Sequence, residues 1–225
     1  MISWELIDKA SVPSGEDELR LYKRGREFSI RVNTCELMNS RAHGSEELLA
    51  EKACELIAGH SCPRVLIGGL GMGYTAAEAL RRLGPDSQVV VAEIVPAVVA
   101  WNRGPLADLA GRPLDDPRLV IRETDIARIL KDESLPYNAI LLDVDNGPSG
   151  LTRKGNSWLY TRTGLEAAFR ALRPSGVMAV WSAGPDQAFT HRLNQTGFEV
   201  KNVRARARDV GKGGHHTIWL AVRAA

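Results

Sequence analysis

Residues 64–73, RVLIGGLGMG, form a glycine-rich turn between a short apolar run and a helical pattern. The apolar run has the valine, leucine and isoleucine content of a strand that is buried on both faces. Glycines in the turn let the backbone bend tightly and let a ligand approach where a Cβ would collide. The stretch therefore predicts an α/β fold with a ligand site after this strand. Dinucleotide enzymes also have such turns, so the turn alone does not identify the ligand.

Short apolar runs and helical segments continue to alternate along the rest of the chain. Valine and isoleucine are frequent in these runs, which is typical of a parallel sheet covered on both faces. The pattern predicts a Rossmann-like α/β sheet of about seven strands. Strands are expected at 64–69, 88–94, 118–123, 137–145, 177–183, 198–205 and 215–223, and helices at 76–84, 96–104, 162–173 and 186–197.

The first 60 residues predict a small appendage to this sheet. Apolar and polar residues alternate within residues 18–33, which indicates a β-hairpin. A helical pattern follows, in which Ser45 can cap the amino end and Gly59 ends the helix. We therefore expect an N-terminal hairpin and helix over residues 1–60 and a Rossmann-like ligand-binding domain over residues 61–225.

The composition narrows the class of protein. The 225 residues include 29 lysines and arginines against 27 acidic residues, and this net charge of +2 predicts no nucleic-acid partner. No apolar run approaches the roughly 20 residues that cross a bilayer, and the polar start does not resemble a signal peptide. We expect a cytoplasmic protein with no membrane partner. His43, His191, His215 and His216 lack metal-ligand spacing, so we expect surface or loop positions for them and no metal.

Acidic residues follow three later strands of the predicted sheet. Glu93 ends the second strand, where Rossmann-like folds place a carboxylate that binds ribose hydroxyls. Asp125 follows the third strand, and Asp143 and Asp145 follow the fourth. The carboxyl ends of parallel strands share one edge, so these acids are expected around the same crevice as the glycine turn. The residues to this point fit a dinucleotide as well as an S-adenosyl compound.

Together these turns resemble the spermidine synthase family, the polyamine aminopropyltransferases within the class I S-adenosylmethionine-dependent methyltransferase fold. The similarity covers roughly residues 19 to 183 and implies that residues 61–225 are a Rossmann-like S-adenosyl-ligand-binding catalytic domain. It implies a last strand antiparallel to the others, decarboxylated S-adenosylmethionine or S-adenosylmethionine as donor substrate, a small-molecule amine as acceptor, and a homodimer. It also implies a role for each marker residue: Gly69, Gly71 and Gly73 in the donor-binding loop, Glu93 on the ribose, Asp125 on the adenine amino group, Ile126 against the ring, Asp143 as catalytic residue and Asp145 as the second.

The chemistry of amine alkylation gives the carboxylate after the fourth strand a task. A polyamine nitrogen has a pKa near that of lysine, about 10, so it is protonated at neutral pH and cannot attack. A carboxylate can bind this cation, accept its proton and align the lone pair, and general-base help is worth roughly 10² to 10⁴ in rate. The resemblance assigns this task to Asp143.

Three stretches of the sequence depart from the family pattern. Met72 stands where the family's glycine loop normally carries an aspartate that recognises the amino end of the decarboxylated donor. Residues 45–47, Ser-Glu-Glu, stand where the family has Tyr-His-Glu or Tyr-Gln-Glu, and keep only the last glutamate. Asp143 and Asp145 are two residues apart, whereas the family spaces its two aspartates three apart.

Aminopropyl transfer to a polyamine-type amine is the leading hypothesis for the function. The alternatives are an S-adenosylmethionine-dependent methyltransferase of a small molecule, a non-catalytic nucleoside-binding relative and, last, a dinucleotide oxidoreductase. Three aromatic residues, Trp158, Tyr160 and Trp181, fit either the wall of an acceptor pocket or the hydrophobic core.

Overall fold

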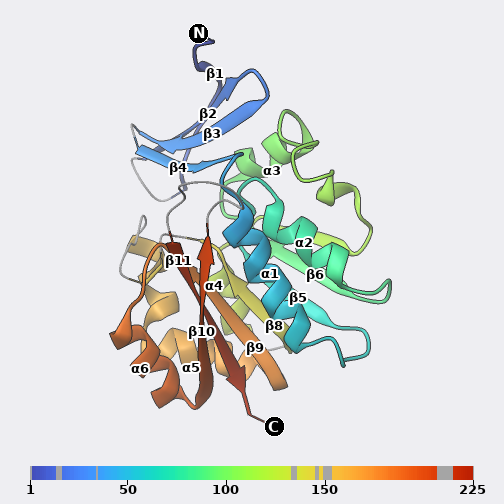
Figure 1. The fold of residues 1–225 in the computed structure, drawn as a ribbon, viewed down its shortest axis with the longest axis vertical. Coiled ribbons are helices and arrows are strands. Elements are labelled where there is room, and N and C mark those ends of the chain that lie inside the picture. Colours follow the sequence, from blue (N-terminus) through green and yellow to red (C-terminus); the bar gives the residue numbers. More distant parts are fainter. Residues whose placement is uncertain are drawn as a thin grey trace.

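The structure is a computed structural model that describes residues 2–13, 17–33, 35–132, 136–144, 147–148, 154–206 and 215–224. It consists of a large central sheet and a small N-terminal sheet, which lies at one end of the molecule (Figure 1). No helix in the described part of the chain combines the length and the apolar character that crossing a membrane requires.

The central sheet has seven strands in the order β10-β11-β9-β8-β5-β6-β7. The pairs from β9 to β7 are parallel, and β11 is antiparallel to both of its neighbours, β9 and β10. The predicted seven strands and the antiparallel last strand are therefore confirmed. The strands are β5 (Arg64–Gly68), β6 (Gln88–Ala92), β7 (Leu119–Arg122), β8 (Tyr137–Leu142), β9 (Leu172–Ser182), β10 (Phe198–Arg206) and β11 (His215–Arg223).

Hydrophobic cores cover both faces of the central sheet. Side chains alternate along each strand, so Val65 and Ile67 of β5 enter one core and Leu66 enters the other. The first core includes residues of α1, α2 and α3, and the second includes residues of α4, α5 and α6. The helices are α1 (Gly44–Leu56), α2 (Tyr74–Arg82), α3 (Pro96–Arg103), α4 (Ile126–Lys131), α5 (Arg162–Ala171) and α6 (Gln187–Thr196), with 3-10 turns at Pro113–Asp115 and Lys154–Tyr160.

The N-terminal sheet extends the predicted hairpin by one strand on each side. Its strands β1 (Glu5–Ser11), β2 (Glu18–Arg24), β3 (Glu27–Val32) and β4 (Cys35–Asn39) pair antiparallel in chain order. Two hydrogen bonds fasten this sheet to the helices: Trp101 Nε1 donates to Asp8 Oδ2 at 2.7 Å, and the Tyr74 hydroxyl donates to the Ser40 carbonyl at 3.2 Å. These bonds thus hold the small sheet against α3 and α2.

The ends of helix α1 differ from the sequence prediction. Its N-cap is His43, without a side-chain capping bond, whereas Ser45 lies inside the first turn. The helix ends at Leu56 rather than Gly59, because Ile57 leaves the helical conformation and is fully buried in the core. Helix α1 also packs against α2 and β9, so this part of the N-terminal segment contacts the central sheet directly.

Candidate active site

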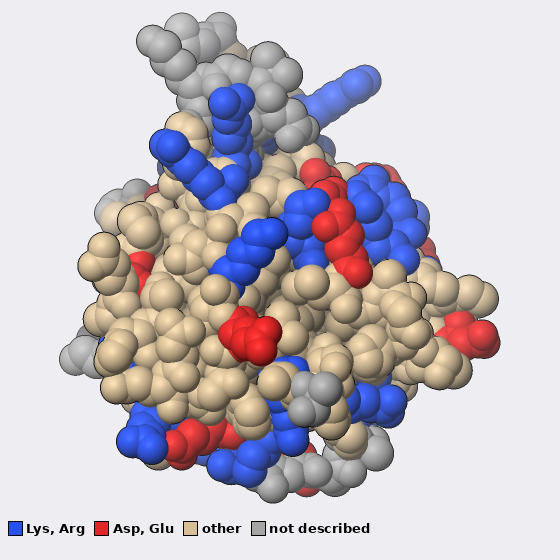
Figure 2. Space-filling model, turned by 60° about the horizontal axis from the view of Figure 1, so that its bottom comes forward, with Lys and Arg blue, Asp and Glu red and all other residues tan. Residues whose placement is uncertain are grey.

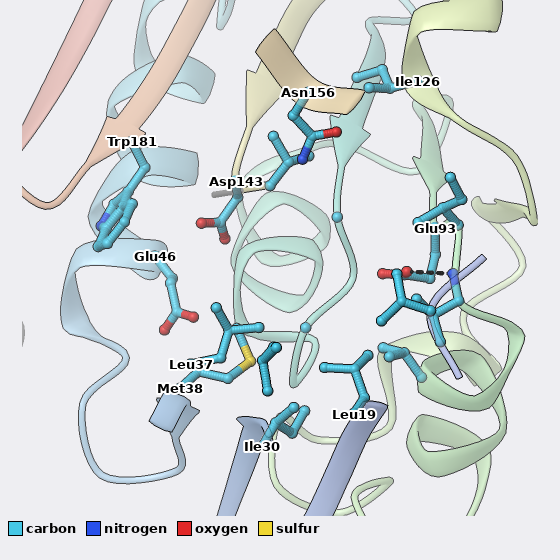
Figure 3. A pocket seen from close by; sticks show the side chains of 18 of the residues that line it. Leu19, Ile30, Leu37, Met38, Glu46, Glu93, Ile126, Asp143, Asn156 and Trp181 are labelled. Atoms are coloured by element: carbon cyan, nitrogen blue, oxygen red, sulfur yellow. Dashed lines mark hydrogen bonds between the residues drawn. The ribbon is translucent and has the colours of Figure 1, made fainter. Parts of the chain in front are cut away.

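A cavity of about 380 Å³ lies where the parallel strands end. The turn after β5 and the residues at the ends of β6, β7, β8 and β9 form one side of it. The first turn of α1 and the beginning of β11 contribute to its wall. Apolar residues of the N-terminal sheet, among them Leu19, Ile30, Leu37 and Met38, cover the opposite side (Figure 3). The small sheet therefore roofs the crevice that the sequence predicted.

The glycine loop depends on its glycines at specific positions. Gly69, Gly71 and Gly73 all have positive φ, at 87°, 54° and 87°. A Cβ on Gly69 would collide with the Asp143 carbonyl, and one on Gly71 would lie 2.8 Å from Met38 Cε. Gly69 and Gly71 line the cavity, whereas Gly73 is the N-cap of α2 and is not among the cavity residues. The loop can thus pass between the Asp143 turn and the roof.

Glu93 lies at the carboxyl end of β6 and lines the cavity. It is 7% exposed, and its two oxygens accept hydrogen bonds from the backbone N–H groups of Leu70 at 2.9 Å and Val95 at 2.8 Å. Each carboxylate oxygen can accept two hydrogen bonds, so Glu93 can join the glycine loop to a ligand's hydroxyl groups. Its position is the one that the sequence predicted for a ribose-binding acid.

Asp125 and Ile126 follow β7 and also line the cavity. Asp125 is the N-cap of α4, and its Oδ1 accepts the backbone N–H of Ala127 at 2.8 Å. Ile126 is buried and packs closely on Gly68, since a Cβ on that glycine would lie 2.7 Å from Ile126 Cδ1. The structure thus places a carboxylate and an adjacent apolar side chain in the same cavity as Glu93.

Asp143 directly follows β8 and points its carboxylate into the cavity (Figure 3). Its Oδ2 accepts a hydrogen bond from Thr75 Oγ1 of α2 at 2.7 Å. Burial raises the pKa of Asp143 to about 6, against the lowering effect of the Thr75 hydrogen bond. A carboxylate whose pKa lies this close to neutrality is suited to accept and release a proton. Asp145, the second predicted catalytic residue, lies outside the described residues.

Glu46 is a cavity residue that the sequence comparison missed. It points into the cavity from the first turn of α1, near Asp143 (Figure 3). Burial, and then the charges of Asp143 and Glu47, raise the pKa of Glu46 well above its ordinary range. The family pattern kept only Glu47, but Glu47 Oε1 instead lies 3.2 Å from His43 Nδ1. Helical phase could have found Glu46, because it begins the buried stripe of α1 that continues at Leu49, Ala50, Ala53, Cys54 and Ile57.

Two aromatic residues close the side of the cavity that lies away from Glu93. Trp181, at the end of β9, lies across the cavity from Glu93 in Figure 3, with Asp143 and Glu46 nearer to it. His216, at the start of β11, lines the same cavity and contacts Trp181 edge to face, with ring centroids 4.6 Å apart. The expected surface or loop position of His216 was therefore wrong. Tyr160 is buried in the second core and Trp158 packs against that core, so neither lines the cavity.

Acidic side chains outnumber basic ones in the cavity lining. The described lining residues include no lysine and no arginine. By contrast, basic and acidic side chains are interspersed on the molecular face in Figure 2. The described residues also contain no group of three histidine, cysteine or acidic side chains that could hold a metal ion. The carboxylates that line the cavity are Asp17, Glu36, Glu46, Glu93, Asp125 and Asp143.

The sheet order, the glycine loop and the acidic crevice define a class I methyltransferase-like α/β protein. Solved spermidine synthases have the same fold. One from Thermotoga maritima aligns with 97% of this chain and 73% of its own at a TM-score of 0.76 and 18% identity. A spermidine synthase in complex with the transition-state analogue AdoDATO aligns with 97% of this chain and 72% of its own at a TM-score of 0.75 and 18% identity.

Two curated relatives with similar sequences are polyamine aminopropyltransferases. Polyamine aminopropyltransferase 2 of Pseudomonas aeruginosa is 35% identical over 172 residues, which are 71% of this chain and 46% of that protein. Polyamine aminopropyltransferase 1 of Streptomyces coelicolor is 28% identical over 182 residues, 80% of this chain and 31% of that protein. The chain thus spans less than half the length of either relative, and no protein-family model matches it. The predicted resemblance to the spermidine synthase-like family is confirmed.

Proposed function

We propose that this protein transfers an aminopropyl group from decarboxylated S-adenosylmethionine to a polyamine-type amine. The observation that carries the proposal is the cavity lining, which has six carboxylates and, among the described residues, no lysine or arginine. The donor carries a sulfonium and an ammonium group, and the acceptor carries at least one ammonium group. Such a ligand set is cationic throughout, and the lining is complementary to it. S-adenosylmethionine itself would bring a carboxylate into this lining.

The proposal gives the two sides of the cavity different tasks. Glu93 accepts hydrogen bonds from the ribose hydroxyls, and Asp125 and Ile126 hold the adenine. The glycine loop, through Gly69 and Gly71, lets the nucleoside lie close to the backbone, and Gly73 shapes the loop as the N-cap of α2. This arrangement is supported by the burial of Glu93 and by its hydrogen bonds to the loop.

On the other side, Asp143 binds the acceptor ammonium and accepts its proton. The free lone pair then attacks the carbon next to the sulfonium, so that a C–N bond forms, the C–S bond breaks and methylthioadenosine leaves. The neighbouring Glu46, whose pKa burial and the charge of Asp143 raise, ionises more readily once the cation is bound and so stabilises it in the same place. Asp145 is the second catalytic residue of the proposal. The assignment is supported by the pKa of Asp143, which burial brings to about 6.

Three further features belong to the proposal. We propose a homodimer in the cytoplasm and a division at residue 60 between the N-terminal appendage and the catalytic domain. The cover that residues of β2, β3 and β4 form over the cavity supports a role for the appendage in substrate binding.

Donor titration tests the proposal directly. We expect calorimetry to show that decarboxylated S-adenosylmethionine binds at least about tenfold more tightly than S-adenosylmethionine, because the carboxylate of the latter meets like charges. Methylthioadenosine should bind, and NAD should not. Mass spectrometry of a reaction with a diamine should show the aminopropylated product. Preference for the carboxylated donor, with a methylated product, would replace the proposal by methyl transfer.

The pH dependence of kcat/KM for the amine provides a second test. Asp143 must be ionised to bind the ammonium, and its folded pKa is raised to about 6. We therefore expect kcat/KM to rise about tenfold per pH unit below that value and to level off above it. Because Asp143 and Glu46 interact, the transition belongs to the pair. A profile without this transition in the wild type would argue against a carboxylate that binds the acceptor.

A further inference from the structure

The glycine loop and the beginning of α3 form two walls of the cavity that one carboxylate connects. Gly71 lines the cavity from the loop, and Val95 and Val98 line it at the beginning of α3. One oxygen of Glu93 accepts the Leu70 N–H and the other accepts the Val95 N–H, so this side chain joins the two walls. In the proposed function the same carboxylate also binds the ribose. A second connection between the walls would keep the loop in place while Glu93 binds a ligand.

Asn102 of α3 makes this second connection, as a donor where Glu93 is an acceptor. Its side chain is 3% exposed, and its Nδ2 donates to the Gly71 carbonyl at 2.8 Å and to the Val98 carbonyl at 2.9 Å. An amide nitrogen carries two protons, so both are used in these bonds. The Asn102 amide therefore joins the loop to the turn of α3 whose Val98 lines the cavity.

The glycine loop needs such a donor because its backbone is easily rearranged. Gly71 has a φ of 54° and no Cβ, so a change in its peptide orientation meets little steric resistance. Asn102 is not among the described residues that line the cavity, so its bond directs the Gly71 carbonyl to a side chain outside the cavity. The Asn102 oxygen also lies close to Gly73, where a Cβ would be 3.0 Å from Oδ1. One side chain thus contacts two glycines of the loop.

We propose that Asn102 is a positioning residue for the S-adenosyl donor, because it holds the Gly71 carbonyl and with it the glycine loop in the shape that accepts the nucleoside. The inference rests on the proposed function and extends it to a residue that touches neither substrate. The bond is present before the ligand binds and has no part in the transfer step. Its removal should therefore weaken donor and product binding to a similar extent and leave the chemical step unchanged.

Two substitutions separate the contact with the loop from the contact within α3. Asn102→Ala removes both donors. Asn102→Ser is too short to reach the loop, but its hydroxyl can donate to Val98, whose carbonyl is four residues back in the helix. Calorimetry should show that both variants bind methylthioadenosine roughly tenfold more weakly than the wild type. Steady-state kinetics should show a similar rise in the KM for decarboxylated S-adenosylmethionine, with little change in kcat.

Asn138→Ala is the matched control, since it truncates a second buried asparagine far from the loop. Asn138 is fully buried, and its Oδ1 accepts the Arg64 N–H at 2.9 Å, at the amino ends of β8 and β5. This variant should unfold at a lower temperature but keep wild-type affinity for methylthioadenosine. Amide hydrogen exchange of residues 69–73 in the ligand-free protein should be faster in both Asn102 variants and unchanged in the control.

The outcomes separate this inference from the proposed function. Wild-type affinity in Asn102→Ser would overturn the inference, because the contact within α3 would then be sufficient. Equal losses of affinity in Asn102→Ala and Asn138→Ala would also overturn it, since lower stability would explain both. The expected binding pattern without turnover of decarboxylated S-adenosylmethionine by the wild type would support the positioning role and refute aminopropyl transfer. A wild type that binds no methylthioadenosine would overturn both.

Discussion

Replacing Asp143 with asparagine should lower turnover by roughly 10² or more, with a much smaller change in donor binding. Asparagine keeps the size of the side chain and can still accept the Thr75 hydrogen bond, but it cannot take the acceptor's proton. The loss should appear in kcat with any amine acceptor. Steady-state kinetics with decarboxylated S-adenosylmethionine, together with calorimetry of methylthioadenosine, measures both quantities. Because asparagine does not titrate, the transition in kcat/KM near pH 6 should change in this variant.

Thr75→Val is the matched control for the Asp143 variant. It keeps the carboxylate but removes the hydroxyl that lowers the pKa of Asp143. The pKa should therefore rise further, and the transition in kcat/KM should move to higher pH while the maximum rate is largely retained. Full turnover by Asp143→Asn would show that Asp143 is structural. If neither wild type nor variant converts any polyamine with either sulfonium donor, a non-catalytic nucleoside-binding protein becomes the better account.

The strands of the central sheet could be predicted because their sequence signals are strong and local. Each buried strand is a short run of β-branched and aliphatic residues, and the glycine turn after β5 has positive φ values that favour glycine. β1 and β4 gave weaker signals, since neither strand has a fully buried residue and β1 leaves Leu6 and Ile7 exposed. α4 has six residues, which is too short for a clear helical period.

Some residues of the candidate site were easier to predict than others for a physical reason. Glu93 and Asp143 each directly follow a parallel strand, and Asp125 comes three residues after one, so the sheet fixes their positions. Glu46 and His216 reach the cavity from a helix that packs on the sheet and from the beginning of an antiparallel strand. Their positions depend on packing and strand direction, which the local sequence does not specify.

Glu93→Ala should weaken binding of methylthioadenosine by about 1 to 3 kcal/mol, because charge-assisted hydrogen bonds to the ribose are lost. Methylthioadenosine is the appropriate probe, since it lacks the sulfonium charge and reports the nucleoside contacts. The substitution also removes the acceptor of two backbone N–H groups, those of Leu70 and Val95. Part of the loss could therefore arise from the glycine loop, and thermal unfolding must be measured beside calorimetry.

Two amide variants separate the hydroxyl contacts from the loop and from the general charge of the cavity. Glu93→Gln retains one carbonyl acceptor, so it should lie between the wild type and Glu93→Ala in affinity. Glu36→Gln removes one negative charge from the same lining. Glu36, however, is exposed on the N-terminal sheet and accepts hydrogen bonds from Ser29 and Asn39. It should leave methylthioadenosine affinity unchanged. Equal losses in the Glu36 and Glu93 amide variants would mean that charge alone matters, and wild-type affinity in Glu93→Ala would refute the ribose assignment.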